Sequence, residues 1–125
     1  MTELVLLMRV IVVLAYFLAC APVSLHAEPV RISYSAISWL MTPVWMAEEL
    51  GLFKKYNLEA QLIYIPSSAT SVQSLLGGSV DVITPGSMMT ITRSFLQERR
   101  DTVERVLCAY VEGMAAYLGQ KERAK

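Results

Sequence analysis

Small hydroxyl side chains, a tryptophan and a glycine follow three predicted strands, and they are the residues of this sequence best suited to binding a ligand. They are Ser35, Ser38 and Trp39 in the first loop, Ser67, Ser68 and Thr70 in the second, and Gly86 and Ser87 in the third. Hydroxyl groups, together with the free N–H groups at the start of a helix, suit a small anionic head group without a cationic side chain. We therefore predict a substrate-binding site along these loops.

Two of these residues have distinct expected roles, and all of them have a structural alternative. Trp39 is placed to cover an apolar or planar part of the ligand, and Gly86 allows the backbone to approach it closely. In the alternative, residues 67–71 only cap a helix, Trp39 belongs to the core and Gly86 serves a turn. The spacing of the residues leaves both interpretations open.

The sequence offers little material for catalysis or metal binding. His26 is the single histidine, and Cys108 is the only cysteine beyond Ala27. This excludes an ordinary zinc cluster, a Cys–His catalytic pair and an intramolecular disulfide in the mature chain. Neither a GxGxxG motif nor a P-loop is present. We predict a protein that is not an enzyme, with no catalytic residues, no metal site and no cofactor.

The elements that position the loops follow the order strand, helix, strand, helix, strand. Residues 30–35 alternate apolar and polar side chains, which predicts a strand with one better-buried face. Thr42 suits an N-cap and Pro43 suits the first helical position. A first helix is therefore predicted from Pro43 to Leu50, with Gly51 in the left-handed conformation that closes it.

The second half of this unit repeats the pattern. Asn57, which tolerates a positive φ, precedes a second strand over residues 58–65. The hydroxyl cluster then leads into a short helix over residues 72–76, and residues 80–84 form a third strand. Successive units of this kind imply right-handed crossovers and an α/β fold with a parallel sheet. Ligands of such sheets bind at the carboxyl ends of the strands, where the hydroxyl-rich loops lie.

The remainder of the sequence is predicted to be helical. One helix is expected over residues 93–98 and a longer one after Asp101, where Asp101-x-x-Glu104 forms a variant of the capping box. Apolar residues keep a helical spacing along the longer segment, at Val103, Val106, Leu107, Tyr110, Val111, Met114, Tyr117 and Leu118. This single stripe predicts core packing, and the charged residues 120–125 are expected to fray.

The N-terminal segment is predicted to be a signal peptide over residues 1–27, cleaved after Ala27. Its unbroken apolar run covers residues 10–21, and as a helix it would rise about 18 Å, short of the roughly 30 Å hydrocarbon core of a membrane. The expected location is the periplasm. Two alternatives remain, namely a lipid anchor on Cys20 and an uncleaved N-terminal helix.

Charge excludes one class of partner. Beyond Ala27 the sequence contains ten basic and ten acidic side chains, without a long run of either sign. Such a balance does not attract a polyanion. No nucleic-acid partner is therefore predicted.

Two stretches of the sequence contain motifs of one known family. The first stretch contains ISYS at residues 32–35, AEELGLFKKYNL at 47–58 and VQSLLGGSVDV at 72–82. The second contains TRSFL at 92–96, RDTV at 100–103 and AYVEGM at 109–114. The first stretch resembles the opening part, and the second a later part, of the substrate-binding proteins of nitrate, sulfonate and taurine type ABC importers, a family that includes domains similar to a pyrimidine synthase.

The resemblance implies a type II periplasmic-binding-protein-like fold that is present only in part. Residues 28–91 would form the N-terminal part of one substrate-binding lobe, and residues 92–125 a later helical segment, with the intervening part of the family's fold absent. The implied function is binding of a small anionic or heteroaromatic solute, either a sulfonate such as taurine, nitrate or a pyrimidine precursor. Delivery to ABC permease subunits is expected, and the binder is expected to be a monomer.

Two other functions stay open beside this one. The first is an enzyme related to the family's pyrimidine synthases, although their histidine and cysteine-rich motif is missing here. The second is a remnant with no independent activity, because a half-site loses the opposing wall that closes over a ligand in a two-lobed binder.

Overall fold

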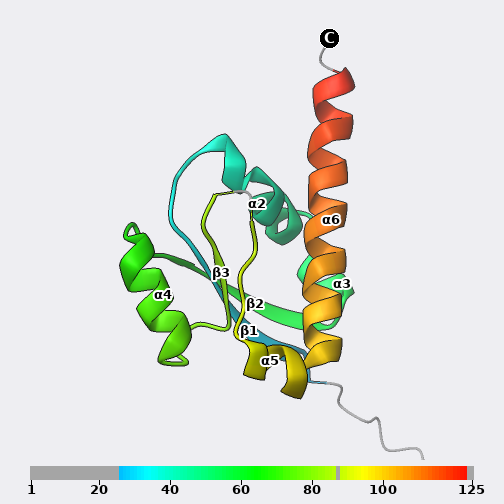
Figure 1. The fold of residues 1–125 in the computed structure, drawn as a ribbon. Coiled ribbons are helices and arrows are strands. Elements are labelled where there is room, and N and C mark those ends of the chain that lie inside the picture. The colour runs from blue at the N-terminus through cyan, green and yellow to red at the C-terminus, as the bar shows by residue number, and fades with distance from the viewer. Residues whose placement is uncertain (1–25, 87, 124–125) are drawn as a thin grey trace, which may run out of the picture.

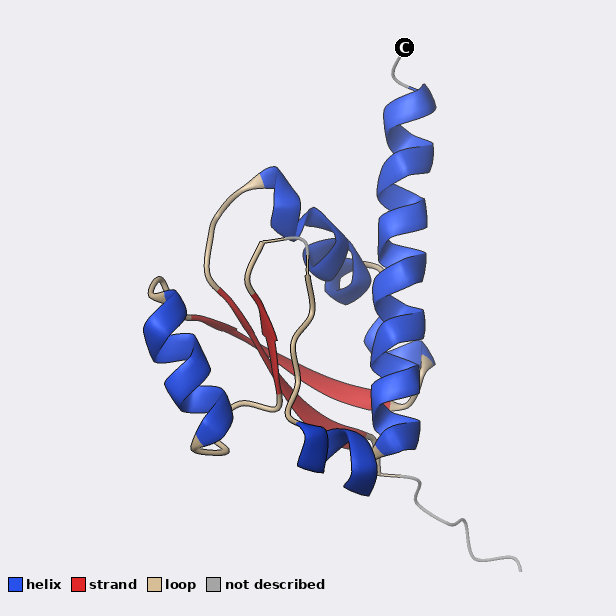
Figure 2. Ribbon diagram, in the orientation of Figure 1, coloured by secondary structure: helices blue, strands red, loops and turns tan. Residues whose placement is uncertain are grey.

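The computed structural model of the protein describes residues 26–86 and 88–123 (Figures 1 and 2). Its elements are β1 (Glu28–Tyr34), the 3-10 helix η1 (Trp39–Met41), α2 (Thr42–Glu49), α3 (Leu52–Lys55), β2 (Leu58–Tyr64), α4 (Ser68–Leu76), β3 (Val82–Thr84), α5 (Arg93–Glu98) and α6 (Arg100–Arg123). Among these residues, no helix combines the length and the apolar character that a membrane crossing requires. The predicted signal segment, including Cys20, lies outside the described residues except for His26 and Ala27.

The sheet has three parallel strands in the order β2-β1-β3. Ile32 of the central strand lies beside Leu62 on one side and Val82 on the other. The predicted α/β class with a parallel sheet is confirmed, and the small, partial architecture is consistent with one lobe of a periplasmic-binding-protein-like fold. The third strand is shorter than predicted, because it begins at Val82 and not at residue 80.

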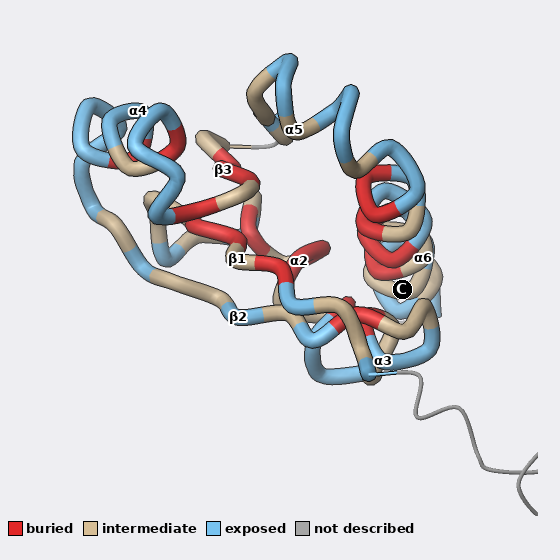
Figure 3. The backbone as a smooth tube through the Cα atoms, turned by 90° about the horizontal axis from the view of Figure 1, so that it is seen from below, coloured by how far each residue is buried: buried red, intermediate tan, exposed pale blue. Residues whose placement is uncertain are grey.

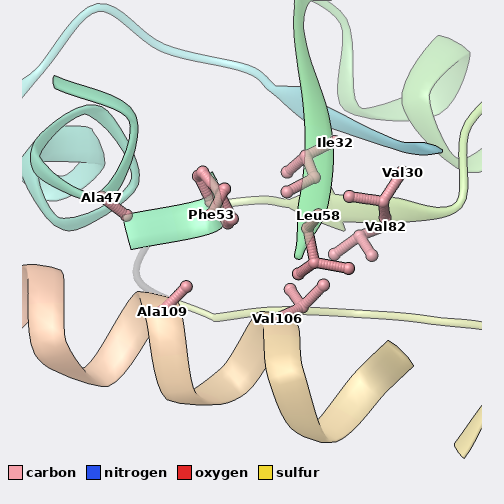
Figure 4. Packing of buried hydrophobic residues seen from close by; sticks show 8 residues of the cluster. All are labelled: Val30, Ile32, Ala47, Phe53, Leu58, Val82, Val106 and Ala109. Carbon is pink, nitrogen blue, oxygen red and sulfur yellow. The ribbon is translucent and has the colours of Figure 1, made fainter. Parts of the chain in front are cut away.

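Helices cover both faces of the sheet (Figure 1). On one face, α2, α3 and α6 enclose the main core of Val30, Ile32, Ala47, Phe53, Leu58, Val82, Val106 and Ala109, shown in Figure 4. On the other face, α4 packs Leu75 against Val80 and Ile83 in a smaller cluster. Because successive side chains of a strand point to opposite faces, β3 supplies Val82 to the main core and Ile83 to the smaller cluster.

The connection between β1 and α2 differs from the prediction. The chain already turns in η1, so Met41 is the N-cap residue of α2, and Thr42 lies inside the helix with Pro43 in its first turn. Thr42 as an N-cap is therefore wrong. Gly51 has φ 66° and Asn57 has φ 55°, so both predicted left-handed positions are confirmed.

Three features of α6 correct the sequence interpretation. The helix begins at Arg100, so Asp101 lies in the first turn of α6 and is not its N-cap residue. The Oδ2 atom of Asp101 is 2.9 Å from Nε of Arg105. The helix continues to Arg123 through residues that were expected to fray. The apolar stripe is also not one core face, because Leu107, Val111 and Leu118 are exposed while Val103, Val106 and Tyr110 are buried.

A short connection closes the outer edge of β3. Ile83 donates its N–H to the carbonyl of Thr90 at 3.0 Å, and Thr90 donates back to the carbonyl of Ile83 at 2.8 Å. Unpaired strand edges invite pairing with other chains. The chain between β3 and α5 therefore protects this edge with one antiparallel bridge.

Candidate functional site

A small cavity lies at the carboxyl ends of β1 and β3, beside the beginning of α4. Its volume is about 40 Å³, and it is lined by Ser33, Ser35, Ser68, Ser71, Val72, Ile83, Thr84 and Pro85. Among the described residues that line it, none is charged and five carry a hydroxyl group. This is the edge where the topology of a parallel α/β sheet places ligands.

Two of the hydroxyl groups are buried without a partner. Ser33 and Ser71 are 1% and 3% exposed, and neither Oγ has a hydrogen-bond partner among the described residues. A third hydroxyl is satisfied, because Oγ1 of Thr84 donates to the carbonyl of Ser33 at 2.9 Å. A buried polar group without a partner costs about 1–3 kcal/mol. Each free Oγ therefore favours a polar atom of a bound molecule at this place.

The beginning of α4 contributes the second part of the site. Ser67 is the N-cap residue, and its Oγ accepts a hydrogen bond from the backbone N–H of Thr70 at 3.3 Å. The N–H of Ser71 donates to the carbonyl of Ser67 at 2.9 Å. The first N–H groups of a helix have no acceptor within it and carry partial positive charge. The cavity thus lies beside a weakly electropositive helix end.

The structure brings only part of the predicted site together. Ser35 and Ser68 line the cavity, while Ser67 and Thr70 form the cap of α4 next to it. Ser87 lies outside the described residues.

The other predicted residues lie elsewhere. Ser38 precedes η1 and has a buried Oγ without a partner among the described residues. Trp39 is 70% exposed and lines a separate apolar groove of about 140 Å³ between η1 and α6. Gly86 has φ 72° and occupies a turn. None of these three residues lines the cavity at the carboxyl ends of β1 and β3, which we call the hydroxyl cavity.

Ser33, Ser71 and Thr84 were missed by the sequence prediction. Ser33 lies inside the first predicted strand, and Thr84 ends the third, so the sequence pattern predicts sheet positions and not loop positions for both. Polar side chains are uncommon at buried positions of a strand, and this is the signal that could have identified Ser33 and Thr84 as site residues. Ser71 belongs to the hydroxyl cluster, and the helical spacing from Ser67 and Ser68 places it on the same end of α4.

An ion pair of the sheet, between Arg31 and Asp81, lies at the opposite end of β3 from the cavity. Arg31 donates to Asp81 through Nε at 3.0 Å and Nη2 at 2.9 Å. Burial opposes ionisation of Asp81, but the hydrogen bonds from Arg31 outweigh it, so the pKa of Asp81 lies below its ordinary value. Since Asp81 precedes β3 and the cavity lies at its carboxyl end, this pair fixes the strand and leaves the cavity uncharged.

No metal-binding arrangement lies in the described part of the chain. No group of three His, Cys, Asp or Glu side chains within it is placed to hold a metal ion. Cys108 is exposed on α6. The hydroxyl cavity can accept and donate hydrogen bonds to a small polar molecule, which is the chemistry of a binding site.

Comparison with known proteins finds a solved structure that is similar to part of this chain. The sequence matches no family model and no curated protein. A solved structure of a protein from Bordetella bronchiseptica RB50 is 28% identical over 46% of this chain and 18% of that protein, with a TM-score of 0.40. The chain thus spans less than a fifth of that protein, and a likeness of this degree carries no argument about its fold or activity.

Proposed function

We propose that the protein binds a small solute as the solute-binding component of an ABC importer in the periplasm. The solute is a small anionic or heteroaromatic molecule, namely a sulfonate such as taurine, nitrate or a pyrimidine precursor. The observation that carries the proposal is the pair of buried, unpartnered hydroxyl groups of Ser33 and Ser71 beside the start of α4. The resemblance of residues 32–58 and 72–82 to importer-associated binders suggests the class of solute and the permease partner.

The dimensions of the cavity define how a solute would sit. A volume of about 40 Å³ accepts a head group, whereas sites that enclose a whole drug-sized ligand measure about 300–1,000 Å³. The head group would accept hydrogen bonds from Ser33, Ser71 and the first N–H groups of α4, without a cationic side chain. The rest of the solute would extend beyond Ser35 and Ser68 at the cavity rim.

Titration calorimetry of the full chain tests this function. Taurine, alkanesulfonates, nitrate and pyrimidine precursors are to be titrated into the protein and into a Ser33→Ala, Ser71→Ala double variant. Each lost hydrogen bond to a charged group is worth about 1.5–3 kcal/mol, so we expect the double variant to bind at least about a hundredfold more weakly. Its free energy of unfolding should be unchanged or higher, because both removed hydroxyls lack partners in the described structure.

A matched control separates binding from a general effect of removing hydroxyls. Ser79 is exposed in the turn after α4, and Ser79→Ala should bind like the unaltered protein. Absence of binding by the folded chain to every solute in the set would reject the proposal and favour a remnant without activity. Equal affinity in the double variant would place the site elsewhere.

A further inference from the structure

The exposed side of α6 carries a second apolar stripe that the body of the protein does not cover. Leu107, Val111 and Leu118 are 45%, 60% and 52% exposed, and Met114 between them is only half-buried. Figure 3 shows the buried residues of α6 on the side of the sheet and exposed residues on the other side. Large apolar side chains in a continuous exposed row mark an interaction surface.

The spacing of this stripe is that of a coiled-coil seam. The steps from Leu107 to Val111, Met114 and Leu118 are four, three and four residues, which is the strict 3.5-residue repeat of a and d positions. Extended by one step at each end, the repeat reaches Glu104 and Lys121. The seam therefore consists of four apolar positions between an acidic and a basic one.

This arrangement is complementary to itself when a second copy runs antiparallel. Aligning Val111 with Met114 of the other copy also aligns Leu107 with Leu118 and Glu104 with Lys121. Each of the two apolar pairs occurs twice about the two-fold axis, so the interface contains four apolar layers. An ion pair between Glu104 and Lys121 lies at each end of these layers. A parallel arrangement would instead place each charged residue opposite its own copy, which is unfavourable.

Neighbouring side chains allow the second helix to approach. Cys108 and Ala115 border the seam on one side, and both are small and exposed. On the other side, Trp39 lines a groove with Met114 and Leu118. A helix on the seam would cover that end of the groove and shield the exposed indole.

We infer that the protein forms an antiparallel homodimer through the exposed seam of α6, defined by Glu104, Leu107, Val111, Met114, Leu118 and Lys121. The inferred dimer differs from the monomer that we expect from the family resemblance. The contact is isologous, because the same surface of each copy forms both halves. Its size corresponds to one helix pair, so the dimer should dissociate on dilution.

Sedimentation equilibrium of the full chain tests the dimer, in a density-matched detergent that masks the N-terminal apolar segment and with reductant to keep both cysteines free. The mass should approach twice 13.9 kDa as concentration rises. Val111→Glu would bury a charge in two layers, so the dissociation constant should increase at least about tenfold. Unaltered association of this variant would overturn the inference, as would a chain that stays monomeric at every concentration.

Charge reversal tests the register independently of solubility. Glu104→Lys and Lys121→Glu should each weaken the dimer, because each places like charges at both ends of the seam, and the double variant should restore it. Circular dichroism verifies that α6 stays folded in all three variants. Failure of the double variant to recover, with its helix content unchanged, would reject the antiparallel register.

Discussion

Replacing Gly113 by alanine is expected to lower the free energy of unfolding by about 3 kcal/mol, the upper range for overpacking a core. An added Cβ would lie 2.4 Å from the carbonyl oxygen of Pro43 and 3.1 Å from the backbone nitrogen of Ala47. Both are backbone atoms of α2, so no side-chain rotation relieves the contact. Helix α2 must move away from α6, and denaturant unfolding followed by circular dichroism measures the cost.

The size of this effect follows from the position of Gly113. The glycine is buried where α6 crosses α2, and Ala47 opposite it is 0% exposed. Ala47 and Ala109 belong to the same core as Val30 and Val82 of the sheet. Separation of the two helices would therefore open the main core, since close-packed interiors do not yield by small local shifts.

Gly119 provides the control on the same helix. A Cβ at Gly119 would meet no atom within 4 Å, so Gly119→Ala should stabilise the protein by about 0.5–1 kcal/mol through helix propensity alone. A Gly113→Ala variant that is as stable as Gly119→Ala would show that the crossing of α2 and α6 tolerates a methyl group and that Gly113 has no special packing role.

The parallel sheet was predictable from local signals. The alternation of β1, the glycine at Gly51 and the asparagine at Asn57 each act within a few residues. The structure contains the strand and both left-handed positions, although Ser33 on the polar face of β1 is buried as well. The hydroxyl-rich loops follow the strands in the sequence, and in a parallel sheet such loops lie at one edge. Local patterning thus determined the fold class and the neighbourhood of the site.

The exact lining of the cavity was not predictable, because it depends on which helix covers which face. Alternation indicates that Ser33 points away from Ile32, but it does not reveal that α4 covers that face and buries the hydroxyl. The two stripes of α6 raise the same difficulty. Val106 and Leu107 fit one helical pattern in the sequence, and only the position of α2 and the sheet decides which of them is buried.

Glu28 joins the beginning of the sheet to the C-terminal helices, and its replacement should have the second large effect on stability. Its carboxylate accepts hydrogen bonds from Nε of Arg99 at 2.8 Å and from Oγ1 of Thr102 at 2.6 Å. A third comes from Nη2 of Arg105, whose Nη1 also donates to the carbonyl of Asn57 at 3.2 Å. One carboxylate therefore links β1 to the residue between α5 and α6 and to the first two turns of α6.

Substitution of Glu28 by glutamine keeps the shape and removes the charge, so we expect a loss of about 2 kcal/mol of unfolding free energy at neutral pH, in the range for hydrogen bonds to charged groups. The control is Glu59→Gln on the neighbouring strand. Glu59 is exposed, and exposed substitutions of this kind change stability by less than about 0.5 kcal/mol. Denaturant unfolding of both variants beside the unaltered chain gives the comparison.

The pH dependence of stability distinguishes the carboxylate of Glu28 from mere packing. The hydrogen bond from Thr102, with those from Arg99 and Arg105, lowers the pKa of Glu28 below its ordinary value of 4.5, although burial opposes this. Because the folded-state pKa is the lower one, the stabilisation is complete above about pH 4.5 and is lost as the pH falls through the folded-state pKa.

Glu28→Gln should therefore lose less stability than the unaltered protein on acidification below pH 4.5. The stability of Glu28→Gln should still depend on pH, since the pKa values of Asp81 and Glu112 are also lowered. Glu59→Gln should follow the unaltered curve. Parallel curves for Glu28→Gln and the unaltered protein would show that the carboxylate contributes by shape alone, and that the C-terminal helices are held to the sheet by their apolar contacts.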